Sequence, residues 1–445
     1  MTFIIINKRN SIYNFDTAQS YAYQFDSSQS ILIDVDLKNG KVKLPKEINR
    51  DQSIFLKVYL KATVIGNYFE PSITITSHNN SFIQYFEIGA KGYRFINLSS
   101  LIEGGAEEIV FNENKVELED QVAQLIIFDN PNLLNSKILV ISPHPDDAEI
   151  AAYGLYSKYP KSFILTITSG EAGSFNYDEL YQDTTNHYLK KGKLRTWNSV
   201  SVPLLGGISR DSVLNLGFFD STLKNMFSLN PMKVNSLFVK NLNRNTYKNI
   251  NISDLKWCIK GDSNWPSLIE NIKCVLKEVN PDIIVTPYPL IDKHEDHKFS
   301  TIAIFQALKE LNMKKGSLFL YTNHFMNDYF PFGKSGSIIS LPPNFEDDIY
   351  FKSIYSNSLD SMLQKDKVFA LESMNDLRMD TEWRFWDKLL INSGLTLNRK
   401  ILGKEKDYFR RSIRSNELFF VVPIEDIYNK QKMKSLVGNS SLIKH

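Results

Sequence analysis

The sequence predicts an α/β protein with a Rossmann-like, mostly parallel sheet, preceded by a β-sandwich and followed by a helical extension. Two features predict the parallel sheet. Short apolar runs without alternation occur at residues 137–142, 163–168 and 282–287, and helical patterns lie between them. A third feature sets the first 130 residues apart, because their apolar positions alternate with a period of two. That alternation is typical of strands with one buried and one wetter face.

The N-terminal part is predicted to be a β-sandwich. Leu56, Val58 and Leu60 alternate with more polar neighbours, and the alternation continues through Val64. Similar strand patterns follow, separated by Asn, Gly, Ser and Asp turns, at residues 73–76, 93–98 and 122–128. The domain could serve packing or dimerisation. Alternatively it could bind glycans through exposed aromatic side chains, for which the candidates are Tyr68, Phe69, Tyr85 and Tyr93.

The central domain carries a dense polar cluster directly after its first strand. The apolar run at 137–142 stops at Pro143, and a helical pattern begins near residue 148. Between them, and in the first turn of the helix, stand His144, Asp146, Asp147 and Glu149. They therefore occupy the carboxyl end of a parallel strand, where open α/β sheets place their ligand crevices.

A second strand, about 150 residues later, ends in the same kind of residues. The run at 282–287 is followed by the sequence Asp-Lys-His-Glu-Asp-His at 292–297 and by a helical pattern to about 311. Two neighbouring strand ends converge, and three ligands of the His, Asp and His type with one open position make a catalytic zinc site. His144, Asp147 and His297 can supply these ligands. Two aspartates after a proline are also ordinary turn chemistry, but clusters at both strand ends favour a site.

These motifs resemble those of the PIG-L (LmbE-like) zinc-dependent de-N-acetylases. Pro-His-Pro-Asp-Asp-Ala-Glu at 143–149 and the second motif at 292–297 carry the resemblance, supported by Thr-Ser-Gly-Glu-Ala-Gly at 168–173 and Leu-Gly-Phe-Phe-Asp at 216–220. The resemblance covers about 137–325, weakens to about 420 and does not reach the first 130 residues. The family includes enzymes acting on N-acetylglucosaminyl-phosphatidylinositol and on the precursors of mycothiol and bacillithiol.

The resemblance implies a role for each residue of the two motifs. His144, Asp147 and His297 would hold Zn²⁺ or another divalent metal. Asp146 would be the general base that takes the proton from the water the metal activates, and His294 would stabilise the oxyanion or protonate the leaving amine. The second motif departs from the family pattern, because Glu295 replaces a proline. We expect that change to affect loop stiffness only.

The resemblance also suggests substrate contacts. Arg195 and Asp220 are candidates for binding sugar hydroxyls or a phosphate. Glu171 could contact substrate or could instead support its Gly-rich loop. Where the family tends to place a glutamate three residues after the arginine, this chain has Asn198, a departure that concerns the substrate contacts and not the metal ligands.

The predicted function is zinc-dependent removal of an N-acetyl group from an amino sugar in a glycan or glycoconjugate. The alternative is a weakly active or inactive glycan-binding or scaffold protein that retains the deacetylase fold. The domains added around the catalytic one favour a conjugate or oligosaccharide over free N-acetylglucosamine.

Composition excludes several other classes. A net charge of +2 with dispersed Lys and Arg residues gives no case for nucleic-acid binding. No stretch approaches the roughly 20 apolar residues of a membrane-spanning helix. Only Cys258 and Cys274 are present, so we expect two free thiols, a reducing compartment and a cytoplasmic protein. The sequence is also compatible with a homo-oligomer.

At 445 residues the chain is long enough for two or three domains. An Asn- and Lys-rich insertion at about 222–263 would be a substrate-shaping lid or a surface excursion. The C-terminal extension is predicted to be helical, with Trp383, Phe385 and Trp386 among its apolar residues, and to end in a strand at 419–422. The expected order is a β-sandwich at 1–130, the deacetylase domain at 131–345, the helical extension packing on it at 346–430 and a tail at 431–445.

Overall fold

The computed structural model describes residues 13–25, 28–78, 80–178, 180–325, 329–346, 349–374 and 408–438. The chain divides into two compact units. The first combines Met1–Asn132 with His324–Gln364 and Arg410–Val421, and the second combines Leu133–Asn323 with Lys365–Phe409 and Val422–His445. Residues 346–364 of the predicted extension therefore group with the N-terminal unit.

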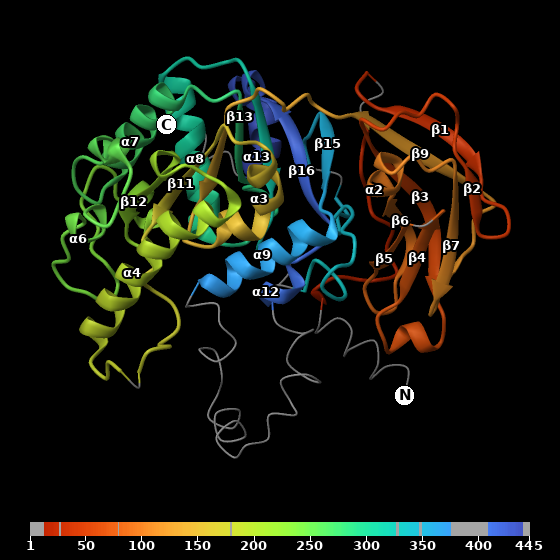
Figure 1. Cartoon of the computed structure of the whole chain (residues 1–445), viewed down its shortest axis with the longest axis horizontal. Helices are drawn as coiled ribbons and strands as arrows, with labels where there is room; N and C mark the ends of the chain where they lie inside the picture. Colours follow the sequence, from red (N-terminus) through yellow and green to blue (C-terminus); the bar gives the residue numbers. More distant parts are fainter. Residues whose placement is uncertain are drawn as a thin grey trace. The chain divides into compact units, whose positions relative to one another are not determined.

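The first unit contains the predicted β-sandwich (Figure 1). One sheet has the order β1-β9-β3-β6, with β8 also paired to β3, and the other has the order β2-β7-β4-β5. Apolar side chains from both sheets form one buried core, as two packed sheets require. The strands are β1 Ile31–Asp36, β2 Lys41–Lys43, β3 Gln52–Ala62, β4 Ser72–Ser77, β5 Asn80–Tyr85, β6 Lys91–Asn97, β7 Glu108–Asn114, β8 Val116–Leu118 and β9 Val122–Asp129.

The sandwich strands lie close to where the alternation predicted them, with one difference. Leu56, Val58 and Leu60 are fully buried in β3. Val64 is instead 79% exposed, because β3 ends at Ala62 and the chain enters a short 3₁₀ turn, η1 Ile65–Asn67. Of the aromatic candidates for glycan binding, Tyr68 and Phe69 are exposed beside this turn.

The second unit is built on five parallel strands in the order β12-β11-β10-β13-β14, which confirms the predicted Rossmann-like sheet. Every residue of the central strands β10, β11 and β13 is buried, which explains why their sequences do not alternate. The strands are β10 Ile138–Ser142, β11 Ser162–Thr168, β12 Val213–Phe218, β13 Ile283–Pro287 and β14 Ser317–Tyr321.

Four helices connect and cover these strands (Figure 1). Helix α7 has an Asn264 cap that accepts from Ser267, Pro266 in its first turn and a left-handed Asn280 at its end. Helices α7 and α8 pack against each other, and α4 packs on β12. The helices are α3 Asp147–Lys158, α4 Thr184–Ser201, α7 Trp265–Val279 and α8 Glu295–Glu310.

The C-terminal part is less helical than predicted, so far as it is described. Helix α9 Ser361–Ser373 and the short α12 Tyr408–Arg411 are present, but β15 Ser353–Ser358 precedes them and pairs antiparallel with β16 Asn416–Pro423. Strand β16 contains the predicted last strand. Trp383, Phe385 and Trp386 lie outside the described residues.

A helix stands where a tail was predicted from residue 431. After the 3₁₀ turn η6 Ile424–Tyr428, helix α13 spans Lys430–Val437 and buries Met433, Leu436 and Val437. The tail prediction is therefore wrong for these residues. The tail was predicted from the basic composition of the segment, which overlooked the apolar residues Met433, Leu436 and Val437. Their i, i+3 and i+4 spacing is that of one helix face.

The insertion at 222–263 packs on the second unit. It contains α5 Leu223–Ser228, α6 Asn245–Lys248 and the 3₁₀ turn η4 Asp254–Cys258. Val239, Leu242 and Tyr247 of the insertion are buried in one cluster with Tyr188 of α4 and Phe219. The insertion is thus held in place by a small apolar core that it shares with α4 and Phe219.

The prediction of two free thiols is wrong, because Cys258 and Cys274 form a disulfide with a Cα–Cα distance of 5.6 Å. The bond joins the end of the insertion to α7. Because disulfides persist mainly in oxidising compartments, this bond removes the reason for expecting a reducing compartment, which was the presence of free thiols. Among the described residues, every helix is too short or too polar to cross a membrane.

Replacing both cysteines by alanine is expected to lower the free energy of unfolding by about 3 kcal/mol, the chain-entropy value for a loop of about 15 residues. The sequence separation is 16 residues. Chemical denaturation of the double variant beside the oxidised wild type would measure the difference. Reactive thiols in the folded wild type, or equal stability of the two proteins, would contradict the disulfide or its contribution.

Candidate functional site

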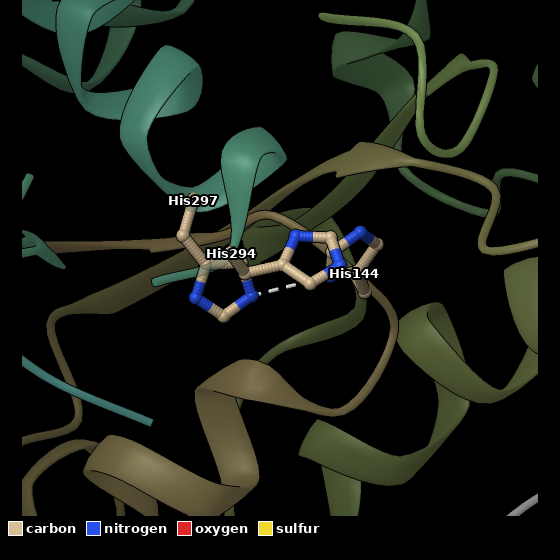
Figure 2. A group of neighbouring side chains, drawn as sticks. All are labelled: His144, His294 and His297. Carbon is tan, nitrogen blue, oxygen red and sulfur yellow. Dashed lines mark hydrogen bonds between the residues drawn. The ribbon is translucent and has the colours of Figure 1, made fainter. Parts of the chain in front are cut away.

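The two predicted strand-end clusters meet at the carboxyl edge of the parallel sheet. His144 lies in the loop between β10 and α3, and Asp147 is the first residue of α3. His294 caps α8 and His297 lies in its first turn. Figure 2 shows the three imidazole rings converging, with His294 and His297 carried by the start of α8. Because β10 and β13 are neighbours, segments about 150 residues apart form one site.

Three donor atoms of the predicted metal ligands lie at almost equal distances. His144 Nδ1 is 3.2 Å from Asp147 Oδ2, His297 Nε2 is 3.1 Å from the same oxygen, and the two ring nitrogens are 3.3 Å apart. Donors about 2.0–2.1 Å from a tetrahedral zinc ion are roughly 3.3 Å apart. The residues present therefore fit a divalent cation of this size, with one side of the cluster left for a further ligand.

The ligand atoms are oriented by a second layer of polar groups. His297 Nδ1 lies 3.0 Å from Asp292 Oδ2, and the Asn323 amide donates to Asp147 Oδ1 over 2.8 Å. His144 Nε2 is buried without a well-aligned hydrogen bond, but it faces Asp220 Oδ1 at 3.2 Å and Asp296 Oδ2 at 3.4 Å. Such partners fix the ring orientation of metal-ligating histidines and make them more basic.

The electrostatics of the site favour a positive charge at its centre. Burial alone would lower the pKa of His297, but the carboxylates of Asp147 and Asp292 raise it to about 10. Burial opposes ionisation of Asp147 and Asp220 too, yet the neighbouring histidines hold the pKa of both carboxyls well below the usual range. The negative charges that stabilise a protonated imidazole would also attract a divalent cation bound in place of the proton.

Asp292 organises both motif histidines and was not identified from the sequence as a site residue. Besides contacting His297, its carboxylate accepts the backbone N–H of His294 over 3.1 Å and that of Asn323 over 3.0 Å. Its position in the sequence could have identified it, because Asp292 is the first residue of the second motif. Asn323 was not predicted either. It lies two residues after the end of β14, at the edge of the sheet where ligand crevices form.

Replacing Asp292 by asparagine is expected to weaken metal affinity by roughly 10- to 100-fold, the usual effect of losing an outer partner of a ligand. The amide cannot accept all three hydrogen bonds. Competition with a chromogenic chelator would measure the affinity. Asp282→Asn is the matched control, because Asp282 precedes β13 at its other end and accepts from the backbone of Lys137. An equal change in both variants would contradict a specific role for Asp292.

Asp146 points away from the helix that it precedes. Its side chain makes no capping bond to α3, and its Oδ2 lies 3.1 Å from Arg195 Nη2. Arg195 also donates to the carbonyl of Gly170 over 3.3 Å. Gly170 has φ +63°, and a Cβ there would be 2.9 Å from the Arg195 guanidinium. The structure thus places Arg195 on Asp146, a contact that the sequence analysis did not predict.

His294 presents one ring nitrogen to the site. Its Nδ1 accepts the backbone N–H of Asp296 over 3.3 Å, so the neutral ring carries its proton on Nε2. The ring centroid lies 4.6 Å from that of His144 and 4.9 Å from that of His297. The three histidines also have donor atoms close enough to share a cation, which makes His294 an alternative third ligand in place of Asp147.

The predicted substrate contacts occupy different positions. Glu171 is fully buried, where its Oε2 accepts from Ser169 Oγ over 2.7 Å and from Asp220 N over 3.0 Å. Its Oε1 accepts from Ser236 Oγ of the insertion over 3.0 Å. Burial, together with the nearby charge of Asp220, raises the pKa of Glu171 to about 7. These contacts match the supporting role that was left open for Glu171.

Asp220 lies between the Gly-rich loop and the predicted metal ligands. Its Oδ1 faces His144, and its Oδ2 accepts the backbone N–H of Ala172 over 3.1 Å. Glu149, the remaining acid of the first motif, is buried and bonded by the hydroxyl of Tyr156. Burial raises the pKa of Glu149 to about 8, which favours its neutral form.

Fold and site together define an α/β protein with a His-Asp-His cluster at the strand ends of a parallel sheet. Residues 139–308 match the family model described as PIG-L, GlcNAc-PI de-N-acetylase. This part of the chain therefore belongs to the PIG-L family. No curated protein matches the chain.

Solved structures show a more distant similarity. N,N′-diacetylchitobiose deacetylase from Pyrococcus horikoshii is 16% identical, with 66% of this chain and 86% of that chain covered and a TM-score of 0.34. The A40926 pseudoaglycone deacetylase is 16% identical over 65% of this chain and 98% of its own, with a TM-score of 0.33. The 4-carboxy-2-hydroxymuconate hydratase from Pseudomonas putida is 14% identical over 64% and 96%, with a TM-score of 0.36.

Proposed function

We propose that this protein is a divalent-metal-dependent hydrolase that removes an N-acetyl group from an amino sugar within a glycan or glycoconjugate. The observation that carries the proposal is the cluster of His144 Nδ1, Asp147 Oδ2 and His297 Nε2, mutually 3.1–3.3 Å apart. Asp146 and His294 flank this cluster, as a base and an acid beside a cation must. Zn²⁺ is the ion that the donor set fits best.

An acetamide is a poor electrophile and neutral water is a poor nucleophile. A divalent cation, when bound, would lower the pKa of a water molecule and polarise a carbonyl oxygen. Asp146 adjoins the ligand Asp147 in sequence, and its ion pair with Arg195 fixes the direction of its carboxylate. We assign to Asp146 the role of accepting the proton of the attacking water.

His294 has the geometry for the second role. The Nε2–H of the neutral ring can donate a hydrogen bond to the oxygen that gains charge, whereas protonating the departing amine would require the imidazolium form of the ring. Asp292 and Asp296 hold the backbone and ring of His294 through the two hydrogen bonds described above. We assign to His294 stabilisation of the oxyanion or protonation of the leaving group.

His294→Ala is expected to lower kcat by roughly 10²- to 10³-fold, the scale of one lost oxyanion stabiliser, while metal content stays unchanged. Steady-state rates and metal analysis of the same preparation would test both halves. A rate close to wild type would remove His294 from the mechanism. Loss of metal would instead make it a ligand, in favour of the three-histidine grouping.

The test of the proposed function is acetate release from a panel of N-acetylated sugars, nucleotide-sugars and lipid-linked glycans. We expect release from conjugates or oligosaccharides in preference to free N-acetylglucosamine, in keeping with the insertion that packs beside the site. Sugar binding without acetate release, by protein that contains a full equivalent of metal, would favour the alternative of a glycan-binding protein with an inactive site. Absence of both would contradict the proposal.

A further inference from the structure

A group of aromatic rings lies beside the Gly-rich loop and has no place in the chemistry described so far. Phe175 follows this loop, Tyr188 belongs to α4, and Phe238 belongs to the insertion. Tyr188 and Phe238 stack with ring centroids 4.0 Å apart and planes at 13°, and the Phe175 ring lies 5.8 Å from that of Tyr188. We call these three residues the aromatic shelf.

The aromatic shelf is only partly covered. Phe175 is 38% exposed and Phe238 is 37% exposed, whereas Tyr188 is buried. Since Tyr188 covers one face of the Phe238 ring, the exposed part of Phe238 lies on the rest of that ring. Phe175 is supported by His187, whose ring centroid is 4.0 Å away. Phe175 and Phe238 are therefore partly exposed and each packs against a buried neighbour.

The rings are held in fixed positions by polar contacts with the loop. The hydroxyl of Tyr188 donates to the carbonyl of Gly173 over 2.9 Å, and Lys191 donates to the carbonyl of Ser174 over the same distance. The backbone N–H of Tyr177 donates to His187 Nε2 over 3.0 Å. A surface fixed in this way loses little conformational entropy when a ligand binds.

A continuous series of contacts connects the aromatic shelf to the metal ligands. His144 faces Asp220, the backbone of Asp220 donates to Glu171, and Glu171 accepts from Ser236. Phe238 follows Ser236 by two residues, a reach of at most about 7 Å. The shelf is thus linked to the proposed reaction centre through Asp220, Glu171 and Ser236.

The exposed area and its chemistry indicate what binds there. Two rings exposed by little more than a third offer on the order of 150 Å², far below the roughly 800 Å² per partner of a stable protein interface. Aromatic faces carry a partial negative charge, which attracts the weakly positive C–H groups of a pyranose face. One sugar ring matches both the area and the charge.

We propose that the aromatic shelf is the subsite for the sugar ring adjacent to the N-acetylated sugar, bound by stacking on Phe238 and Phe175. The proposal rests on the proposed function, because it names the substrate class of the same site as an amino-sugar oligosaccharide. It assigns to the insertion a role in selecting substrate length. It does not depend on which residue acts as base or oxyanion stabiliser.

The test compares binding of N-acetylglucosamine, N,N′-diacetylchitobiose and triacetylchitotriose, measured by titration calorimetry with the Asp146→Asn protein so that turnover does not interfere. We expect tighter binding of the disaccharide than of the monosaccharide, with little further gain for the trisaccharide. Adding Phe238→Leu, which keeps apolar bulk against Tyr188 but removes the π face, should weaken disaccharide binding roughly 3- to 10-fold more than monosaccharide binding. Phe175→Ala should act in the same direction.

Trp257→Ala is the matched control, since Trp257 is a more exposed aromatic residue of the same insertion and packs beside Lys260. It should leave the length preference unchanged. An equal effect of Phe238→Leu on all three sugars, or the same loss of preference in Trp257→Ala, would overturn the subsite while leaving the deacetylase proposal intact. Failure of all three sugars to bind or to release acetate with the wild-type protein would overturn both.

Discussion

Asp146→Asn is expected to lower acetate release by roughly 10²- to 10⁴-fold, the usual contribution of a general base, while the bound metal stays in place. The amide keeps the size of the carboxylate but cannot accept a proton at neutral pH. Asp146 pairs with Arg195, whereas the three clustered donor atoms belong to His144, Asp147 and His297. Its loss should therefore affect the rate of the chemical step and leave the cation site intact.

Asp147→Asn is the comparison variant, because it replaces the adjacent aspartate that is predicted to bind the metal. Asp147 Oδ2 lies within 3.2 Å of the ring nitrogens of both His144 and His297, so its replacement should release metal and activity together. Metal analysis and single-turnover rates on both variants would separate the two roles. Equal metal loss in the two variants would mean that the adjacent aspartates have been assigned wrongly.

His297→Ala is expected to lose the metal and, with it, all measurable turnover. The imidazole of His297 supplies one of three clustered donor atoms and is completely buried. Its removal also leaves the Asp292 carboxylate without its ring partner, a cost that adds to the lost ligand. Elemental analysis after dialysis would give the metal content per chain, and we expect a value near zero against about one for wild type.

His187→Ala is a suitable control for the loss of a buried imidazole, because His187 lies in α4 among Phe175, Tyr177 and Tyr188 rather than in the cluster. It should retain metal. Full occupancy in His297→Ala would refute the ligand assignment. The pair of histidine variants therefore distinguishes a metal ligand from a residue that only stabilises the fold.

Several features of this protein follow from local sequence. The unalternating runs at 138–142 and 283–287 become fully buried parallel strands, because a strand covered on both faces has no polar side to encode. The position of His144, Asp147 and His297 follows from the rule that parallel strands end at one edge. Both depend on residues close in sequence, so the pattern carries the information.

Other features depend on partners far apart in the sequence. Ser236 donates to Glu171 across 65 residues, and Asn323 donates to Asp147 across 176. Each pairing involves a loop residue, for which no periodicity or strand-end rule specifies the side chain that it meets. The same reason explains why the contact between Arg195 and Asp146 was not predicted.

Local patterns in the sequence are sufficient to predict the two fold types, the parallel strands and the meeting of His144, Asp147 and His297, because hydrophobic periodicity and strand-end position are local properties. Tertiary structure alone decided that Cys258 and Cys274 are joined, that 430–437 is a helix, and that the insertion supports Glu171. Two cysteines in a sequence give no distance between their Cα atoms, and bonding requires that distance to be short. An apolar stripe likewise becomes a stable helix only when the rest of the fold provides a surface to cover it.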